Sequence, residues 1–112
     1  MDLTVAILAR DEADRIGDAI RSASFADEVL VLDCGSRDRT VSLSRELGAR
    51  VVETDWPGFV EQRNRALGEA RGARVFFLDA DERITPELAR ALVVEEGAAR
   101  VRDPAAIEAV GV

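Results

Sequence analysis

Arg74-Val75-Phe76-Phe77-Leu78-Asp79-Ala80-Asp81-Glu82 is the stretch that decides the fold of this chain. Its apolar first half is typical of a buried β-strand, and it stops abruptly in three acidic residues within four positions. The acids therefore follow the carboxyl end of a strand, which is the edge where open α/β sheets bind ligands. Mg²⁺ and related hard cations favour a few carboxylates together with substrate phosphates. Asp79 and Asp81 thus predict an Asp-x-Asp site for a divalent metal and a diphosphate.

Apolar and amphipathic segments alternate along the rest of the chain. Three earlier apolar runs, bounded by charged or turn residues, are expected to be strands: 3–9, 28–33 and 50–53. Apolar residues at three- and four-residue spacing predict helices that begin near positions 11, 36, 57 and 85. This order implies an α/β fold with a doubly wound, mainly parallel four-stranded sheet and right-handed crossovers. The simplest such arrangement has the strand order 3-2-1-4.

Individual residues predict where the helices begin, where they end and which face is buried. Asp11 is expected to cap the first helix, and Gly48 to end the second. Thr85 followed by Pro86 has the pattern of an N-cap and a first helical position. Five residues are expected to form the inner face of the third helix: Phe59, Val60, Arg63, Leu67 and Ala70.

The composition is that of one modest globular domain. Apolar residues make up 47% of the 112 residues and charged residues 33%, as in ordinary soluble domains. The net charge of −7 argues against nucleic acid as a partner, because nucleic-acid-binding domains usually carry a basic patch. We expect neither a signal peptide nor a membrane span, since no apolar run approaches the ~20 residues that a span needs. The single cysteine, Cys34, excludes an internal disulfide and suits a cytoplasmic location.

Three polar clusters follow three of the predicted strands, at residues 10–12, 33–36 and 79–82. Parallel strands place their carboxyl ends at one edge of a sheet, so in the order 3-2-1-4 these clusters line a single crevice. Gathering carboxylates is costly without a compensating cation. A shared divalent ion removes that cost, and it can also stabilise a leaving group.

At this point the sequence resembles a known family. The matching stretches are Leu8-Ala9-Arg10-Asp11-Glu12-Ala13, Ala26-Asp27-Glu28-Val29, Asp33-Cys34-Gly35-Ser36-Arg37-Asp38-Arg39-Thr40-Val41, Gln62-Arg63-Asn64-Arg65-Ala66-Leu67 and Leu78-Asp79-Ala80-Asp81-Glu82-Arg83. They cover about residues 3 to 90, and they resemble the nucleotide-binding half of a family 2 glycosyltransferase with the Rossmann-like GT-A fold. The resemblance is to the bacterial branch that builds lipopolysaccharide cores and related glycans.

The resemblance implies a nucleotide-binding set, which comprises Ala9, Arg10, Glu12, Asp33, Arg63 and Asp79. The stretch 9–12 would contact the base and ribose, and Asp33 would hydrogen-bond the base. Arg63 would approach the diphosphate or the base from the third helix. Cys34 stands where the family usually has Ser.

The resemblance also implies a metal, a donor and an acceptor. Asp81 would coordinate Mg²⁺ or Mn²⁺, and Asp79 would share that metal and hold the ribose or sugar. The donor would be a nucleotide-diphosphate sugar, with a UDP-sugar favoured, and the reaction would be inverting transfer to a glycan or lipid-linked acceptor in cell-envelope synthesis. The location would be cytoplasmic, including the inner face of the membrane.

The family domain is about twice this long, so the resemblance implies a truncated domain over 1–96 and a tail of uncertain structure over 97–112. The acceptor half and the general base would be missing, which leaves enzymatic activity open. Without further strands, residues 75–78 would form an exposed apolar edge, which is a known route to pairing with another chain. We therefore expect homo-oligomers through that edge or the tail. The alternative function is a non-catalytic remnant that acts as a self-associating structural or interaction module.

Each site residue also has a purely structural interpretation. Residues 79–82 can be a solvated turn, and residues 10–12 a helix start with favourable charge. Asp33 can shape its own turn, and Arg63 can be a solvated or ion-paired residue. Two other enzyme classes fit less well. A nucleotidyltransferase would show a Gly-rich basic loop after the first strand, and a phosphoacceptor signalling domain would need a Lys, which this chain lacks.

Overall fold

Four strands and four helices alternate in a computed structural model that describes residues 2–94. The elements are β1 (Leu3–Ala9), α1 (Ile16–Ser22), β2 (Glu28–Asp33), α2 (Thr40–Glu46), β3 (Arg50–Glu53), α3 (Phe59–Glu69), β4 (Arg74–Asp79) and α4 (Pro86–Val94). All neighbouring strands are parallel, and their order is β3-β2-β1-β4. The predicted α/β class, strand positions and order 3-2-1-4 are therefore confirmed.

The register of the sheet aligns the strand ends. Ala9 at the end of β1 pairs with Asp33 at the end of β2, and Leu8 pairs with Asp79 at the end of β4. Asp33 also pairs with Glu53 at the end of β3. The turns that follow the strands consequently lie along one edge of the sheet, its carboxyl edge, where the crevice was predicted.

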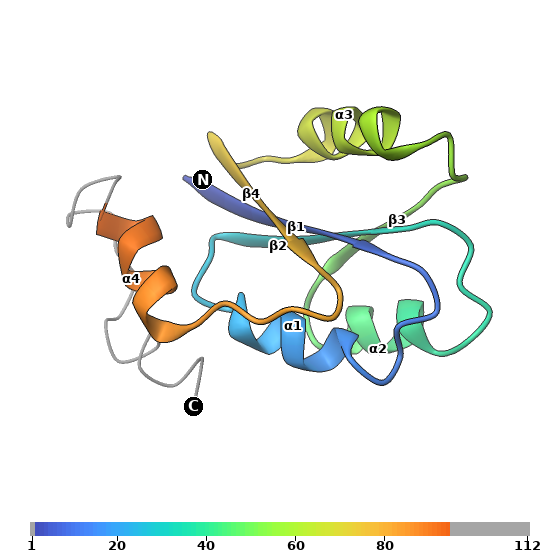
Figure 1. The fold of residues 1–112 in the computed structure, drawn as a ribbon, viewed down its shortest axis with the longest axis horizontal. Coiled ribbons are helices and arrows are strands. Elements are labelled where there is room, and N and C mark those ends of the chain that lie inside the picture. The colour runs from blue at the N-terminus through green and yellow to red at the C-terminus, as the bar shows by residue number, and fades with distance from the viewer. Residues whose placement is uncertain (1, 95–112) are drawn as a thin grey trace.

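Helices cover both faces of the sheet (Figure 1), and each face has its own core. Alternate β1 residues, including Val5 and Ile7, face α1, α2 and α4 in the larger apolar cluster. The intervening residue Ala6 packs with β2 residues and with Ala66 of α3 in the smaller cluster. Since successive strand residues point to opposite faces, the nearly unbroken apolar β1 is explained by burial on both sides. The sheet is thus a rigid central layer for the turns at its edge.

Two predictions at helix ends were right and one was wrong. The Thr85 hydroxyl accepts a hydrogen bond from the Leu88 backbone N–H at 3.2 Å, as an N-cap does. Gly48 directly follows the C-cap residue of α2. Asp11, in contrast, does not cap α1, because that helix begins only at Ile16 and its N-cap position makes no side-chain hydrogen bond.

The predicted inner face of α3 was wrong for four of its five residues, and only Ala70 packs against the smaller apolar cluster. The residues of α3 that are fully buried are Gln62 and Ala66, whereas Phe59, Val60 and Leu67 are 68%, 73% and 53% exposed. The Gln62 amide Nε2 donates to the Thr54 hydroxyl at 2.6 Å, which satisfies a buried polar group. The helix therefore turns a small residue and a paired amide to the sheet and carries its large apolar residues outward.

The remaining expectations concern an edge, a tail and a membrane. Within residues 2–94, β4 is an outer strand of the sheet, and Val75, Phe76 and Phe77 are half-buried. The expected tail over 97–112 lies outside the described residues. No helix in the described part of the chain has the length and apolar character required to cross a membrane.

Candidate functional site

A cavity of about 450 Å³ lies at the carboxyl edge of the sheet. This volume is within the range of typical small-ligand pockets, about 300–1,000 Å³. The residues that line it are Leu8, Ala9, Arg10, Glu12, Cys34, Trp56, Phe59, Asp79, Ala80 and Asp81. It therefore brings together five of the seven predicted site residues, from the ends of β1 and β4. The other two, Asp33 and Arg63, are outside the lining.

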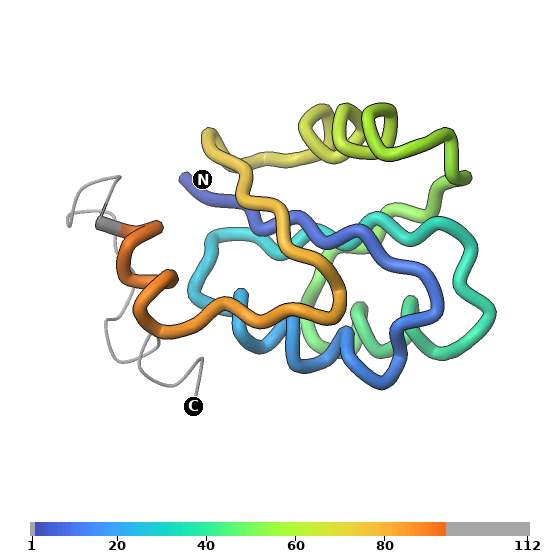
Figure 2. The backbone as a smooth tube through the Cα atoms, in the orientation of Figure 1, coloured from blue at the N-terminus to red at the C-terminus, as the bar shows by residue number. Residues whose placement is uncertain are grey.

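Hydrogen bonds join the turn after β1 to the turn after β2. The backbone N–H groups of Asp11 and Glu12 donate to the hydroxyls of Ser36 and Thr40, at 2.8 and 2.9 Å. In return, a carboxylate oxygen of Asp11 accepts from the Arg37 N–H at 2.7 Å. The two turns lie side by side (Figure 2), although they are about 25 residues apart in the sequence. These three hydrogen bonds hold the backbone that directly follows Arg10, a residue of the cavity lining.

Asp33 is buried and uses both carboxylate oxygens within its own turn. Its Oδ2 accepts from the N–H groups of Gly35 and Ser36, at 3.2 and 2.9 Å. Its Oδ1 accepts from the Ser36 hydroxyl. Gly35 has a φ of 95°, which a residue with a side chain rarely adopts, so the turn needs this glycine. The structural interpretation of Asp33, as the residue that shapes its turn, is thus observed directly.

The turn after β4 carries three carboxylates within four residues. The Asp79 N–H donates to Glu82 Oε1 at 3.0 Å, and the Glu82 N–H donates to the Asp79 carbonyl at 2.9 Å. Asp79, Asp81 and Glu82 are all exposed. Desolvation and the negative charges of Glu82 and Asp81 raise the pKa of Asp79 above its ordinary value of 3.8, while Arg63 opposes this shift. A cation at this turn would relieve the repulsion.

Arg63 of α3 lies over the ring of Phe77 in β4. Its guanidinium carbon lies 4.2 Å from the centre of the Phe77 ring, which is a cation–π geometry. Its positive charge acts on the Asp79 carboxylate. Arg63 is therefore the cation next to the acidic turn, although its predicted place on the buried face of α3 was wrong.

The donor set at the β4 turn fits a metal that is shared with a ligand. Among residues 2–94, no group of three or more His, Cys, Asp or Glu side chains is arranged to hold a metal ion by itself. Mg²⁺ sites, however, commonly use one or two carboxylates and complete their shell with water and substrate phosphates. Asp79 and Asp81 supply two carboxylates at the cavity wall, and this fits such a shared site.

Cys34 has the character of a structural thiol. Its Sγ donates to the Ala9 carbonyl at 3.4 Å, which ties the end of β2 to the end of β1. Burial, followed by the charge of Asp33, raises the pKa of the Cys34 thiol, although Arg10 counteracts this in part. A raised pKa leaves little thiolate at neutral pH, so Cys34 is unsuited to act as a nucleophile.

Two aromatic residues that sequence reasoning did not assign to the site also line the cavity. Trp56 and Phe59 are 44% and 68% exposed, and their rings meet edge-to-face with centroids 5.1 Å apart. They follow β3, and the acids at its end, Glu53 and Asp55, are not among the residues that line the cavity. A sequence signal that could have found them is the Pro57–Gly58 pair between two aromatic residues at a strand-to-helix junction.

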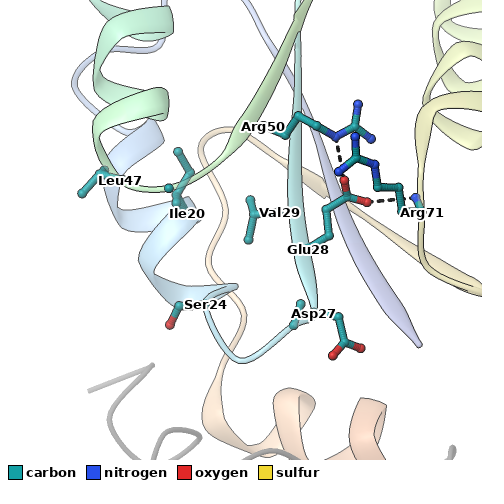
Figure 3. Close-up of a pocket in the computed structure, with 10 residues that line it drawn as sticks. Ile20, Ser24, Asp27, Glu28, Val29, Leu47, Arg50 and Arg71 are labelled. Atoms are coloured by element: carbon teal, nitrogen blue, oxygen red, sulfur yellow. Dashed lines mark hydrogen bonds and ion pairs between the residues drawn. The ribbon is translucent and has the colours of Figure 1, made fainter. Parts of the chain in front are cut away.

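A second cavity, of about 290 Å³, lies at the amino edge of the sheet. Glu28 and the arginines Arg50 and Arg71 meet there (Figure 3). Glu28 accepts from Arg50 Nε at 2.8 Å and from the Arg71 backbone N–H at 2.9 Å. These groups satisfy one another and join three parts of the chain, so this cavity is explained by a structural role.

Comparison with known proteins gives one family. Residues 4–95 match the profile of Glycosyl transferase family 2. A TPR repeat-containing protein from Synechococcus elongatus is 39% identical over 87 residues, which are 76% of this chain and 22% of that protein. An uncharacterized glycosyltransferase from Rickettsia bellii is 41% identical over 83 residues, 73% of this chain and 28% of that protein.

A solved structure has the same arrangement. Glucosyl-3-phosphoglycerate synthase from Mycobacterium tuberculosis, in complex with Mn²⁺, UDP and glucosyl-3-phosphoglycerate, matches with a TM-score of 0.64 and 33% identity. The match covers 70% of this chain and 33% of the synthase. The same enzyme has also been solved with Mg²⁺ and UDP. This chain thus spans about a third or less of the proteins that it resembles.

Proposed function

This chain belongs to glycosyl transferase family 2, and we propose that its carboxyl-edge cavity binds a nucleotide-diphosphate sugar together with a divalent metal. The observation that carries the proposal is the convergence of the β1 turn and the acidic β4 turn on one cavity. UDP-sugars are the favoured donors, because the related synthase holds UDP with Mn²⁺ or Mg²⁺. The proposed reaction is inverting sugar transfer to a glycan or lipid-linked acceptor.

We assign the metal and diphosphate to the β4 turn. Asp81 and Asp79 would hold Mg²⁺ or Mn²⁺ through the Asp-x-Asp motif, and the metal, when bound, would stabilise negative charge on the departing diphosphate. Desolvation, followed by like-charge repulsion from Glu82 and Asp81, raises the pKa of Asp79, and a cation would relieve that repulsion. Arg63 would add a second positive charge beside the phosphates.

We assign the nucleoside to the turns after β1 and β2. Arg10 and Glu12 border the cavity directly, and Ala9 forms part of its floor. Asp33 would act on the base, either by direct hydrogen bonding or through the turn that its two oxygens shape. The hydrogen bonds between the β1 turn and the β2 turn would hold the binding surface in place before the ligand binds.

Transfer also requires a general base that takes the proton of the acceptor hydroxyl. We assign no such base within residues 2–94, and we propose donor binding as the activity of this chain alone. A lipid-linked acceptor would bring the reaction to the cytoplasmic face of a membrane, in cell-envelope synthesis.

A second proposal is self-association through β4, which would suit a non-catalytic structural module. The supporting observation is that β4 is an outer strand carrying the apolar run Val75–Leu78. Unpaired N–H and C=O groups on such a strand are a template for another chain. Light scattering at high concentration tests this, and a monodisperse monomer would remove the proposal.

The donor site is tested by thermal unfolding with UDP, GDP, CDP and dTDP, each with Mg²⁺ or with EDTA. A ligand at ~100 times its dissociation constant adds roughly 2.7 kcal/mol to stability. We expect a shift with one nucleotide that requires Mg²⁺ and is lost in Asp81→Asn. The matched control is Asp18→Asn, which removes the same charge from an exposed position on α1. Equal shifts in both variants would overturn the metal assignment, and no shift with any nucleotide would overturn donor binding.

A further inference from the structure

The Trp56–Phe59 pair is a ligand-facing wall that the assignments above do not use. We propose that this pair is the stacking platform for the nucleobase of the donor. The inference rests on the proposed function, and it adds the part of the cavity that recognises the planar base.

The first argument is the position of the pair. The carboxylates of Asp79 and Asp81 come from the turn after β4, and the two aromatic residues come from the segment after β3, at the other end of the strand order. One cavity therefore has an acidic wall and an aromatic wall. A nucleoside diphosphate has the matching division, because a metal-bound diphosphate suits carboxylates and a planar base suits an aromatic face.

The second argument is exposure. Phe59 and Trp56 are two of the four large apolar residues that the described chain leaves exposed. The other two, Val60 and Leu67, lie on α3 outside the cavity lining. Phe59 presents the larger free surface, and Trp56 meets it at an interplanar angle of 83°. The lining also includes two small residues, Ala9 and Ala80, which take up little of the cavity.

The third argument is that the segment carrying the pair is held in place. The Thr54 backbone N–H donates to the Asp33 carbonyl at 2.7 Å, and the Thr54 hydroxyl accepts from the buried Gln62 amide at 2.6 Å. Arg65 pairs with the Asp55 carboxylate at 2.5 Å. These contacts hold the segment on both sides of Trp56, so a base would meet a preorganised wall and lose little affinity to ordering.

The fourth argument is the backbone between the two rings. Gly58 has a φ of 117° and begins α3 directly before Phe59. A residue with a side chain is strained in that conformation, although nothing lies within 4 Å of the position that a Cβ would take. The glycine is thus required by the turn itself, and this turn precedes Phe59, whose exposed ring lines the cavity.

The chain offers a direct optical reporter, because Trp56 is its only tryptophan and it contains no tyrosine. Fluorescence excited at the red edge of tryptophan absorption therefore reports on Trp56 alone, whose ring lies against Phe59. We would titrate the 112-residue chain with UDP, uridine and inorganic pyrophosphate, each with Mg²⁺. Mg²⁺ is preferred to Mn²⁺, which quenches fluorescence by itself. UDP and uridine are expected to change the emission, and pyrophosphate is expected to leave it unchanged.

Variants then separate base stacking from the rest of the site. Base–aromatic stacking is worth about 1–3 kcal/mol per base by alanine substitution, so Phe59→Ala is expected to bind UDP about 5- to 150-fold more weakly. Phe59→Leu keeps an apolar side chain without a π face and should lose much of the same affinity. Val60→Ala, on the next residue and outside the cavity lining, should bind UDP like wild type. Pyrophosphate affinity should be the same in all four proteins.

The outcomes distinguish this inference from the proposed function. Metal-dependent UDP binding with wild-type affinity in both Phe59 variants would overturn the stacking platform and leave the donor site intact. An emission change with pyrophosphate equal to that with UDP would overturn it as well. Absence of UDP binding in wild type, by calorimetry and by thermal shift, would overturn the donor site and the platform together.

Discussion

Replacement of Glu28 by Gln tests how the structure holds the sheet together. The Glu28 side chain is only 7% exposed. Its Oε1 accepts from Arg50 Nε at 2.8 Å, and its Oε2 accepts from the Thr4 hydroxyl at 2.8 Å and the Arg71 N–H at 2.9 Å. One carboxylate therefore joins β1, β2, β3 and the connection that leads into β4. Figure 3 shows the contacts with Arg50 and Arg71.

The expected cost follows from these contacts. Gln has almost the same volume, but its NH₂ group must face either Arg50 or the Arg71 N–H, both of which are donors. A hydrogen bond to a charged group is worth about 1.5–3 kcal/mol, and an unsatisfied buried group costs about 1–3 kcal/mol. Arg50 is 28% exposed and can turn partly to water, so the lower part of the summed range applies. We predict a loss of about 2.5–3 kcal/mol, or roughly 10–20 °C in Tm for a domain of this size.

The loss of stability caused by Glu28→Gln must decrease as the pH falls. Burial tends to raise the pKa of Glu28, but the hydrogen bonds from the Arg71 N–H, Arg50 and Thr4 outweigh it and lower the pKa below its ordinary value of 4.5. A lowered pKa contributes stability that is complete above the unfolded value and is lost as the pH falls through the folded value. The difference between wild type and Glu28→Gln is therefore largest near pH 7 and shrinks below about pH 4.5.

Urea denaturation from pH 7 to pH 3 measures this difference directly. The matched control is Glu46→Gln, since the Glu46 side chain is 62% exposed and lies 3.7 Å from Arg39, which is 69% exposed. Substitutions at such surface positions usually change stability by less than about 0.5 kcal/mol. A Glu28→Gln effect as small as the control, or one that does not change with pH, would refute the reasoning.

Three further predictions concern glycines and the acidic turn. A Cβ on Gly72 would lie 2.6 Å from the Thr4 backbone nitrogen, so Gly72→Ala should cost about 3 kcal/mol or more in urea denaturation, and a wild-type midpoint would contradict this. Gly58→Ala meets no neighbour but keeps a φ of 117°, so it should cost roughly 1–3 kcal/mol, and a cost as large as that of Gly72→Ala would show that the turn is misplaced. The raised pKa of Asp79 means that folding disfavours its charged form, so Asp79→Asn should raise Tm in the absence of metal. The same variant should abolish Mg²⁺-dependent UDP binding. A Tm below that of wild type without metal would contradict the prediction.

The sheet was predictable from sequence because its signals are local and strong. β1 and β2 are apolar runs bounded by charge, and the observed limits, Leu3–Ala9 and Glu28–Asp33, coincide with the predicted ones. The polar clusters after them had to meet at one edge once the strands were parallel. The gathering of Ala9, Arg10 and the β4 acids at one cavity was predictable for the same reason.

The face of α3 was not predictable, because the apolar pattern gives the wrong answer there. Phe59 and Leu67 read as a buried stripe, yet Gln62 and Ala66 face the sheet. The burial of Gln62 depends on the Thr54 hydroxyl, eight residues away on the preceding connection, and no periodicity reveals such a pairing. The outward position of Phe59 is also what places it at the cavity.

Asp11 shows a second limit of local reasoning. An acid after a strand and before a helical pattern predicts an N-cap, but Asp11 adopts a φ of 52° and accepts a hydrogen bond from Arg37 in the neighbouring turn. Its role is set by a residue 26 positions away. Long-range pairings of this kind, between turns at the edge of the sheet, determine the detailed shape of the site.

Calorimetric titration of UDP into the 112-residue chain, with Mg²⁺ and then with EDTA, tests the central claim most directly. A metal shared by Asp79, Asp81 and a diphosphate predicts one site per chain, at least tenfold tighter binding with Mg²⁺, and loss of that difference in Asp81→Asn. Equal affinity with Mg²⁺ and with EDTA, or an Mg²⁺ effect that survives in Asp81→Asn, would contradict the account of this crevice as a metal-dependent donor site.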